Sequence, residues 1–482
     1  MHRPNLLLIT TDQQRGDCLS CDGHPVLETP NLDALAERGF RFIHAYTSVP
    51  SCTPARAAFL TGMDQWNHGR LTMTGNSAME YPQTIPGGLA AAGYHTQGVG
   101  KMHFHPQRKL YGFHNTVLDE SGRSLDGFVS DYRAWFEQHK EGDYGYRDHA
   151  LEWNSWMARP SHLPEHLHPT YWTVSEGVNF IRRRDPTQPF FMWLSFARPH
   201  SPYDPPQIYW DMYADAEIPE PPLGDWCAEF DIPIADVNAP FAHRPWVQTR
   251  RARQGYYGSV TFIDHQLGRF FYEVNDHDRD LLRNTLILFT SDHGDMLGDH
   301  HHWRKTYAYE GSARVPWIIV PPAEWGLSVN ETREAVVEMR DVLPTLWDAA
   351  GLEIPETVDG GSLLPVLRDP EAEWREFIQG EHTTCYRRQY GMQYVTDGRE
   401  KFVWFHHTGR QQFFNLSQDP QERYDLAAHP DWQERISLWR RRLAEINERR
   451  GDPRGQNGEL VVQEKALILS PNYERWREAA RQ

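Results

Sequence analysis

The sequence predicts an α/β protein built on a large, mainly parallel sheet that is sandwiched between helices. Continuous apolar runs at residues 6–9, 190–194 and 286–289 have the pattern of strands buried on both faces, and helical patterns lie between them. After residue 380 the pattern changes to shorter runs separated by turn residues, which indicates a smaller antiparallel sheet.

The first elements follow one another closely along the chain. Residues 6–9 read as a strand, Pro30 opens a helix that Gly39 ends, and residues 40–46 form the next strand. Further strands are predicted at residues 95–99, 190–194, 286–289 and 317–320. Helices between such strands place the sheet in the middle of the domain.

Two long segments interrupt this pattern. Residues 108–169 and 203–250 are rich in Pro, His, Asp and Trp and show no clear periodicity. They predict long insertions over the sheet, and insertions of that length in a compact domain are commonly functional.

The C-terminal part is expected to be a separate subdomain. Short strands are predicted at residues 390–396, 401–405 and 411–414, with Asp397-Gly398 as a turn, and residues 431–449 form an Arg-rich amphipathic helix. The remaining tail to residue 482 receives no assignment. We therefore divide the chain into an α/β domain at 1–378, which carries the candidate site, and a C-terminal subdomain at 379–482.

Composition restricts the class of partner. The chain has 49 Lys and Arg against 66 Asp and Glu, for a formal charge of -17, which works against binding nucleic acid or a long polyanion. No run approaches the roughly 20 apolar residues of a membrane helix. We therefore expect neither a nucleic acid nor a membrane as partner, and we leave the oligomeric state open.

The start of the chain and the cysteines favour the cytoplasm. The apolar run at residues 6–9 is too short for a signal peptide. Five scattered cysteines, at positions 18, 21, 52, 227 and 385, do not form a disulfide framework and suit a reducing compartment. We assign no role to the pair Cys18-Leu19-Ser20-Cys21.

Two polar pairs follow predicted strands. Asp12-Gln13 comes after the first strand, and Asp292-His293 comes after a later one. Because ligands collect at the carboxyl ends of strands in an open α/β sheet, both pairs can converge on one cation. The aspartates would supply charged oxygens, Gln13 a neutral oxygen, and His293 a nitrogen or a nearby hydrogen bond.

The segment Cys52-Thr53-Pro54-Ala55-Arg56 is the most informative. Pro54 suits the first turn of a helix, so Cys52 is predicted at the positive N-terminus of that helix, with Arg56 extending from its first turns. An anion would be held there. C-x-P-x-R followed by a helix and Thr61-Gly62 resembles the signature of the type I sulfatases of the alkaline phosphatase superfamily.

This resemblance implies an alkaline phosphatase-like fold and a modified nucleophile. In the family, the cysteine matching Cys52 is converted to formylglycine, whose hydrate attacks the sulfur of a sulfate ester beside one divalent metal that it also helps to bind. A formylglycine-generating enzyme or an anaerobic sulfatase-maturating enzyme is therefore an expected partner.

Further motifs of the family appear in the same order. Gly100-Lys101-Met102-His103 resembles its Gly-Lys-x-His element, which implies that Lys101 holds a sulfate oxygen and that His103 accepts a proton when the covalent intermediate breaks. His200 is the candidate to contact the bridging oxygen, Lys305 to help protonate the leaving alcohol, and Arg56 to hold sulfate oxygens. The resemblance extends from near residue 5 to near residue 430, where Asp419-Pro420-Gln421-Glu422 resembles the closing element.

The metal motifs depart from the commonest family pattern, which has Asp-Asp and Asp-Asn. Asp12-Gln13 and Asp292-His293 resemble instead the carbohydrate 2-O-sulfatases that act on unsaturated uronic acids, and the phosphonate monoester hydrolases. Ca²⁺ is the expected metal because the ligands are mostly oxygens, while His293 leaves room for Mg²⁺ or Mn²⁺.

The expected function is hydrolysis of a sulfate ester on a small anionic saccharide, such as a uronic-acid 2-O-sulfate. The main alternative is a phosphonate monoester or phosphodiester hydrolase that uses the same formylglycine. A phosphatase of the wider superfamily fits less well, because those enzymes place Ser or Thr at the nucleophile. A silent sugar-sulfate binding protein with unmodified Cys52 is the alternative from another class.

Two further features receive no functional role. Three consecutive histidines after Asp299 would point in different directions and are interpreted as a polar loop. Arg387 and Arg388, near His382, are predicted to be exposed rather than to face the pocket.

Overall fold

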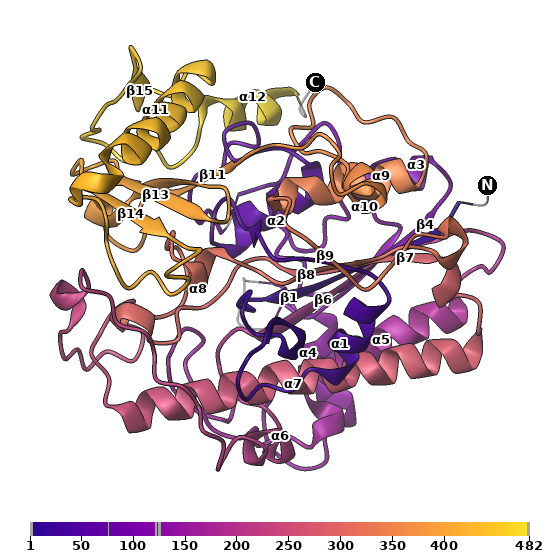
Figure 1. Cartoon of the computed structure of the whole chain (residues 1–482). Helices are drawn as coiled ribbons and strands as arrows, with labels where there is room; N and C mark the ends of the chain where they lie inside the picture. The colour runs from indigo at the N-terminus through magenta and orange to yellow at the C-terminus, as the bar shows by residue number, and fades with distance from the viewer. Residues whose placement is uncertain (1–2, 76, 121–122, 124–126, 480–482) are drawn as a thin grey trace.

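The computed structural model describes residues 3–75, 77–120, 123 and 127–479. Within them, an eight-stranded sheet with the strand order β5-β4-β6-β1-β7-β8-β2-β9 forms the centre of the molecule (Figure 1). Its strands are β1 (Asn5–Asp12), β2 (Phe40–Phe42), β4 (His95–Gly100), β5 (Asn115–Leu118), β6 (Phe190–Pro199), β7 (Thr285–Ser291), β8 (Trp317–Val320) and β9 (Glu331–Arg333).

The pairing of these strands confirms a mainly parallel sheet. Strands β5, β4, β6, β1 and β7 are parallel to one another. Strand β8 is antiparallel to both β7 and β2, and β2 is again parallel to β9. The central strands, β6, β1 and β7, therefore all end at the same edge.

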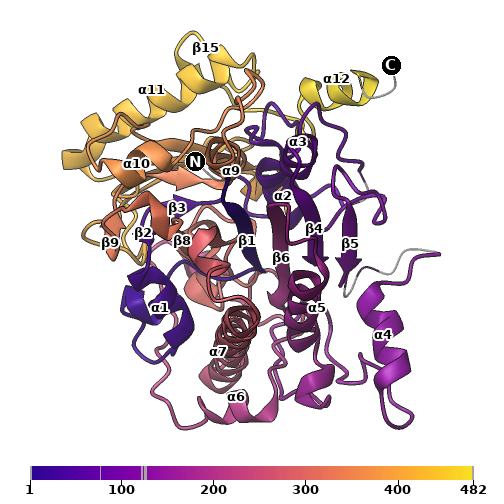
Figure 2. The same cartoon turned by 90° about the vertical axis from the view of Figure 1, so that its right-hand side faces the viewer.

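Side chains of β1 show why the sheet is buried on both faces. Leu6 and Leu8 join one apolar core, whereas Leu7 and Ile9 join the other. The first core lies under α2 (Cys52–Thr61), α3 (Ile85–Ala91), α9 (Val342–Ala349) and α10 (Leu364–Arg368). The second lies under α1 (Pro30–Glu37), α5 (Pro169–Arg183) and α7 (Trp246–His277), on the opposite side of the sheet (Figure 2).

A smaller antiparallel sheet follows, as predicted. It is formed by β11 (Ile378–His382), β12 (Met392–Thr396), β13 (Glu400–Phe405) and β14 (Gln411–Asn415), and α11 (Gln433–Arg449) covers it (Figure 1). Trp439 and Leu443 of this helix pack on Phe402 and Trp404. The tail adds the β15 (Gly455–Gln456) and β16 (Glu459–Leu460) hairpin and α12 (Pro471–Ala479).

The strand predicted at residues 40–46 is wrong as a single element. Only β2 joins the large sheet, while β3 (Ala45–Tyr46) pairs with β10 (Val337–Glu338) in a separate two-stranded sheet. Both halves are apolar, so the sequence pattern does not reveal the break.

The two predicted insertions contain more regular structure than expected. Residues 108–169 hold β5 and α4 (Asp131–His139), and residues 203–250 hold α6 (Gln207–Asp211) and the beginning of α7. A further short helix, α8 (Glu310–Ala313), follows the second polar pair. None of the helices in the described part of the chain combines the length and the apolar character needed to cross a membrane.

Gly100 allows β4 to end close against β6. Its φ is +89°, and a Cβ at this position would lie 2.0 Å from the carbonyl oxygen of Ser195. That same oxygen accepts a hydrogen bond of 2.8 Å from the backbone nitrogen of Lys101. The glycine therefore fixes the point at which the chain leaves the sheet toward Lys101.

We expect Gly100→Ala to destabilise the fold by about 2–5 kcal/mol, from a left-handed backbone and a steric overlap together. Gly93→Ala is the matched control, because its φ of +88° is similar while nothing lies within 4 Å of the added Cβ. It should cost only about 1–2 kcal/mol. Urea unfolding would measure both, and equal losses would show that the contact with Ser195 contributes nothing.

Candidate functional site

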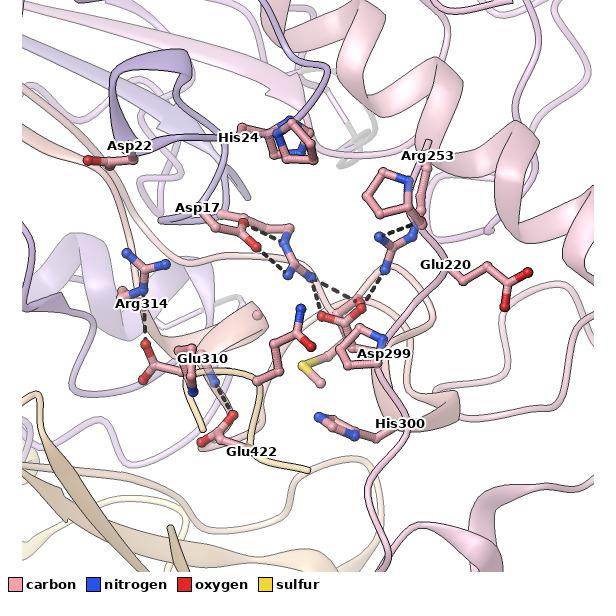
Figure 3. Close-up of a pocket in the computed structure, with 18 of the residues that line it drawn as sticks. Asp17, Asp22, His24, Glu220, Arg253, Asp299, His300, Glu310, Arg314 and Glu422 are labelled. Atoms are coloured by element: carbon pink, nitrogen blue, oxygen red, sulfur yellow. Dashed lines mark hydrogen bonds and ion pairs between the residues drawn. The ribbon is translucent and has the colours of Figure 1, made fainter. Parts of the chain in front are cut away.

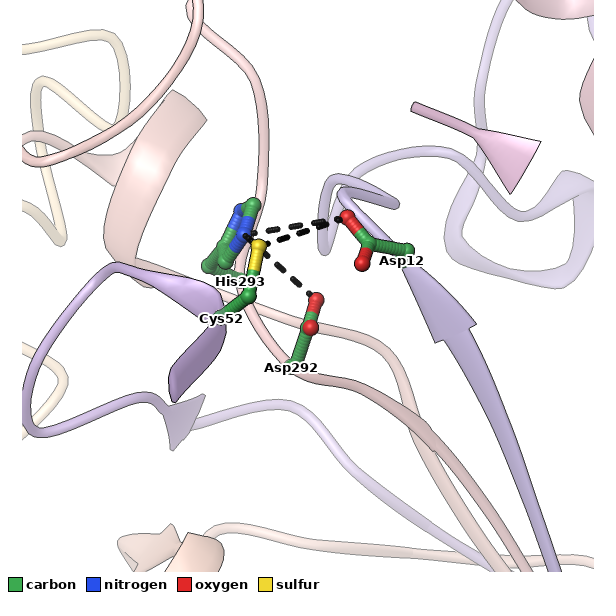
Figure 4. Close-up of side chains that lie close together, drawn as sticks. All are labelled: Asp12, Cys52, Asp292 and His293. Carbon is green, nitrogen blue, oxygen red and sulfur yellow. Dashed lines mark hydrogen bonds and ion pairs between the residues drawn. The ribbon is translucent and has the colours of Figure 1, made fainter. Parts of the chain in front are cut away.

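Four buried side chains converge beyond the ends of β1 and β7. Asp12 ends β1, Cys52 begins α2, and Asp292 and His293 follow β7 (Figure 4). One potential ligand atom from each lies within 4.8 Å of the others. The two polar pairs and the cysteine predicted from the sequence therefore come together in one place.

The distances within this cluster are short. Cys52 Sγ lies 3.2 Å from His293 Nε2 and 3.8 Å from Asp12 Oδ1. His293 Nε2 is 3.6 Å from Asp292 Oδ1. The other ring nitrogen of His293 contacts the carbonyl oxygen of Gly294 at 2.9 Å, which turns Nε2 toward the cluster.

Strand register explains the convergence. Thr11 of β1 lies opposite Ser291 of β7, so the residues that follow them leave the sheet side by side. The backbone nitrogen of Asp292 donates to the carbonyl oxygen of Thr11 at 3.2 Å, and that of Gln13 donates to Asp292 Oδ1 at 3.1 Å. The positive end of α2 then presents Cys52 to this pair of loops.

Arg56 binds the carboxylates rather than the cavity. Its guanidinium is fully buried, with Nε 3.0 Å from Asp292 Oδ2 and Nη2 3.5 Å from Asp12 Oδ2. Nη1 donates to Ser195 Oγ at 3.0 Å and to the carbonyl oxygen of Lys101. This differs from the predicted contact with sulfate oxygens, because every nitrogen of the guanidinium is already engaged inside the protein.

Cations around the cluster favour its charged forms. Burial would raise the pKa of Asp12, but Lys101, whose Nζ lies 2.5 Å from Oδ2, and other nearby cations outweigh it and hold this pKa well below its usual range. Burial and a neighbouring carboxylate also oppose ionisation of Cys52, yet Lys305 and Lys101 lower the pKa of this thiol.

Asp295 orients Gln13, a role that the sequence analysis did not assign. Gln13 Nε2 donates to Asp295 Oδ2 at 2.5 Å, and Tyr203 donates to the same oxygen at 2.5 Å. Since an ionised carboxylate only accepts, the amide nitrogen must face it and Oε1 faces Lys305, 2.9 Å away. Asp295 is the last residue of the segment Asp-His-Gly-Asp, so its position beside Asp292 and His293 could have indicated a role in the site.

The cluster has the donor set of a divalent cation site. Asp12 and Asp292 offer carboxylate oxygens and His293 a ring nitrogen, and all three are fully buried within reach of one another. Gln13 Oε1 is held on the same side through Lys305. Two buried carboxylates beside one imidazole fit a hard or borderline divalent metal.

A cavity with a volume of about 310 Å³ opens onto Cys52. Lys101, His103, His200 and Lys305, all predicted from the sequence, line it. The structure adds residues that the sequence analysis did not single out, from the loop after α2, the first insertion, the loop before Lys305 and the loop between β11 and β12: Met73, Arg123, Trp153, Asn154, Arg304 and Tyr386.

The two cavity histidines differ in their partners. Among the described residues, neither ring nitrogen of His103 has a hydrogen-bond partner, although the side chain is buried. Burial, and then Arg123, hold the pKa of His103 well below its usual range. His200 is anchored through Nδ1, 2.8 Å from the carbonyl oxygen of Ser201, so its Nε2 remains available.

Lys305 lies directly beside Cys52. Its Nζ lies 3.3 Å from Cys52 Sγ. Arg387 and Arg388 are exposed and do not line the cavity, as predicted. The adjacent Tyr386 lines it instead.

A second cavity, of about 230 Å³, is lined in part by residues of the loops that follow β1 and β7 (Figure 3). Six carboxylates and three arginines line it, and several of them form ion pairs. Arg15 pairs with Asp17 and with Asp299, each at 2.7 Å, and Arg253 of α7 also binds Asp299. This network joins the loop after Gln13 to the loop before Lys305 and so supports the catalytic side.

Comparisons with known proteins agree with this geometry. A family model described as sulfatase matches residues 4–352, and one for the C-terminal part of N-sulphoglucosamine sulphohydrolase matches residues 298–449. An arylsulfatase of Clostridium perfringens is 43% identical over 455 residues, which cover 92% of this chain and 94% of that protein. A choline-sulfatase of Rhizobium meliloti is 31% identical, covering 89% and 83%.

Solved structures show the same fold. The phosphonate monoester hydrolase of Agrobacterium radiobacter is 25% identical with a TM-score of 0.79, covering 93% of this chain and 96% of that one. A protein solved with its substrate D-glucosamine-2-N,6-O-disulfate has a TM-score of 0.74 at 22% identity, covering 94% and 99%. On the family match and the identity to the arylsulfatase, this chain belongs to the sulfatase family and is a sulfuric ester hydrolase.

Proposed function

We propose that the enzyme cleaves the sulfate ester of a small saccharide that carries a second negative charge, such as a uronic-acid 2-O-sulfate. One observation carries this proposal. Four cationic side chains, Lys101, Arg123, Arg304 and Lys305, line the cavity, and none of the fifteen described residues that line it is an aspartate or glutamate. Two cations suffice for the sulfate, and Arg123 already pairs with Glu120 at 2.7 Å, so Arg304 remains for another anionic group.

The aromatic lining supports a sugar. Trp153 and Tyr386 are wide enough to pack on a sugar ring, and Arg304 already lies 4.5 Å from the ring centre of Tyr386. Trp153 Nε1 is buried without a hydrogen-bond partner among the described residues. Such an indole N–H can donate to a substrate hydroxyl.

The reactive group in this proposal is Cys52 after oxidation. Formylglycine would supply a hydrated aldehyde as nucleophile, and a divalent metal held by Asp12, Asp292, His293 and Gln13 would supply positive charge for the sulfate and for that nucleophile. Calcium and formylglycine are typical of the family. Cys52 lies at the floor of the cavity, where an ester group would meet it.

The remaining side chains bind and move protons. Lys101 and Lys305 hold sulfate oxygens, because both ammonium groups lie beside Cys52 and line the cavity. Lys305, an ammonium group, carries the proton for the departing alcohol oxygen, and His200 contacts that oxygen through Nε2, because burial holds the pKa of His200 well below its usual range and its Nδ1 faces the carbonyl oxygen of Ser201. His103 is neutral and unpartnered, so it accepts a proton when sulfate is expelled.

Burial also bears on the maturation partner. Cys52 is 2% exposed and Arg56 is 0% exposed, so the folded chain offers this motif to no second protein. We propose that a formylglycine-generating or anaerobic sulfatase-maturating enzyme oxidises Cys52 before this region folds.

The names of two similar proteins suggest other substrates, which can be compared with the lining of the cavity. Choline-sulfatase acts, by its name, on an ester with a cationic head group, which the cationic lining here would repel. The second candidate is a phosphonate monoester hydrolase, favoured by the structural likeness to the enzyme of Agrobacterium radiobacter. A site for tetrahedral anions accepts both chemistries on charge alone.

Cys52→Ala should lower sulfatase activity by more than about a thousandfold, because it removes the carbon framework of the nucleophile. Turnover of an aryl sulfate, with melting temperature as the check on folding, measures this. The matched control is Cys21→Ala, at a half-buried thiol away from the cavity, and it should keep full activity. Full turnover by Cys52→Ala would overturn the assignment.

Removal of metal should inactivate the enzyme reversibly. Chelation followed by readdition of Ca²⁺, Mg²⁺ or Mn²⁺ tests this and identifies the ion. Asp292→Asn keeps the shape of the side chain while removing its charge, so metal content and rate should fall together by at least about tenfold. Asp280→Asn, at a side chain 93% exposed, is the control. Activity in protein that elemental analysis finds free of metal would contradict the proposal.

Arg304→Gln should separate the substrate classes. We expect it to raise KM about 10–100-fold for a sulfated uronic-acid disaccharide, because a charge-assisted hydrogen bond to the carboxylate is lost. The KM for an aryl sulfate should remain nearly unchanged. Arg388→Gln, at an exposed neighbour outside the cavity, should change neither.

The same panel includes choline sulfate and phenyl phosphonate, compared by kcat/KM in one buffer and metal. A wild-type enzyme that prefers the phosphonate to each sugar sulfate would show that the second candidate is correct. An equal effect of Arg304→Gln on acidic and neutral substrates would show that the cation serves only the sulfate.

A further inference from the structure

The three consecutive histidines at 300–302 lie in different environments. His300 is buried and accepts a hydrogen bond of 3.0 Å from the backbone nitrogen of Gly224. His302 is buried against the ring of Phe230. The side chain of His301 turns instead toward the protein surface, where it meets two residues of the 203–250 insertion.

Those two residues are Asp231 and His243. His243 Nδ1 lies 2.8 Å from Asp231 Oδ1, and His301 Nε2 lies 3.9 Å from the same oxygen. The two imidazole rings are 5.7 Å apart. One potential ligand atom from each of the three residues lies within 4.8 Å of the others, and the three residues are all different from those of the cluster at Cys52.

Backbone pairing holds the three residues together. The nitrogen of Ala242 donates to the carbonyl oxygen of His301 at 2.9 Å, and that of His243 donates to Ile232 at 2.9 Å. Isolated bridges join Phe241 to His302 and Pro233 to His243. The side chains are therefore presented by a fixed backbone rather than brought together by chance rotamers.

The backbone of His301 is itself unusual. Its φ is +63°, and that of His300 is +53°, so two neighbouring residues with side chains both occupy the left-handed region. Such conformations are strained and persist where the surroundings determine them. Here they direct His300 inward and His301 toward Asp231.

We infer that Asp231, His243 and His301 form a second metal site, for a borderline divalent ion of the zinc class. Two imidazole nitrogens and one carboxylate oxygen suit Zn²⁺, Co²⁺ or Ni²⁺, whereas Ca²⁺ and Mg²⁺ require more oxygens. Ligand atoms of a tetrahedral zinc site are about 3.3 Å apart. The two separations from Asp231 Oδ1, 2.8 and 3.9 Å, lie on either side of that value.

The half-exposed side chains leave room for the small rotations that binding needs. Asp231 and His243 are 53% and 49% exposed, and solvent can occupy the fourth position. With neutral imidazoles the site carries one negative charge, which attracts a dication. The ion would replace the hydrogen bond between Asp231 and His243.

This site would connect the insertion to the catalytic loop. His301 precedes Lys305 by four positions, and the same loop is already joined to the insertion where the backbone nitrogen of Trp303 donates to the carbonyl oxygen of Pro240 at 2.9 Å. Tyr307 donates to that oxygen as well, at 2.8 Å. A bound ion would add a further connection between the insertion and the loop that carries the cavity-lining Arg304.

Metal counting tests the inference without requiring turnover. Metal-stripped full-length enzyme would be dialysed against Zn²⁺ and analysed for bound zinc. We expect His243→Ala and Asp231→Asn each to bind one equivalent less per chain than the wild type. Any zinc at the Cys52 cluster is common to all samples and cancels. Both substitutions are at half-exposed positions, so the fold should persist.

The matched control is His429→Ala. His429 is also about half exposed and lies 4.0 Å from the carboxylate of Asp431, but among the described residues this pair belongs to no group of three potential metal ligands. It should bind as much zinc as the wild type. The visible absorption of bound Co²⁺ should be equal in the wild type and the control, and weaker in both test variants. Equal zinc content in the wild type and the two test variants would overturn the inference.

Discussion

The site depends on one buried guanidinium. Asp12 and Asp292 are both fully buried, and removing two carboxylates from water costs several kcal/mol for each ion unless cations and hydrogen bonds compensate. Arg56 contacts both carboxylates, and through Ser195 and the carbonyl oxygen of Lys101 it also binds the ends of β6 and β4. Because Cys52 is one turn earlier on the same helix, the motif holds Cys52 and the guanidinium that binds both carboxylates in a fixed relative position.

The local sequence pattern was sufficient to predict the strands that are buried on both faces of the sheet. The run at residues 6–9 could be assigned because its alternate side chains all enter apolar cores. Helix α7 could not, although it spans Trp246–His277. Polar residues occupy its buried positions: Arg253 binds Asp299, and Asp264 accepts N–H groups at the start of α1. Those partners are distant in sequence, so the helical period is hidden.

The same distinction applies to the site. Asp12, Cys52, Lys101, His200 and Lys305 follow strands or occur in recognisable motifs, and the structure gathers all of them. By contrast, Trp153, Arg123 and Tyr386 reach the cavity from the first insertion and from the loop between β11 and β12. Nothing in their neighbours in sequence marks them, since long-range packing alone brings them there.

Backbone strain is concentrated in the same loops. Gln13, His103, Arg304 and Thr306 all have positive φ, with Thr306 at +83° despite its β-branched side chain. Left-handed conformations of this kind cost roughly 1–2 kcal/mol each, so the surroundings must impose them. For Thr306, the backbone nitrogen donates to the carbonyl oxygen of Pro50 at 2.9 Å, next to the segment that holds Cys52. This strain allows the loops to hold the side chains of the site in fixed directions before a substrate binds.

Charge distribution then decides what can approach. The chain carries a formal charge of -17, while the lining of the cavity carries only cations among its charged side chains. Solvent ions screen exposed charges beyond about 8 Å at physiological ionic strength. A mono- or disaccharide therefore experiences mainly the cationic cavity once it reaches the opening. For the small sulfated saccharide proposed as substrate, this charge pattern predicts discrimination by size, because the net negative charge of the protein would repel a long sulfated polymer more strongly than a mono- or disaccharide.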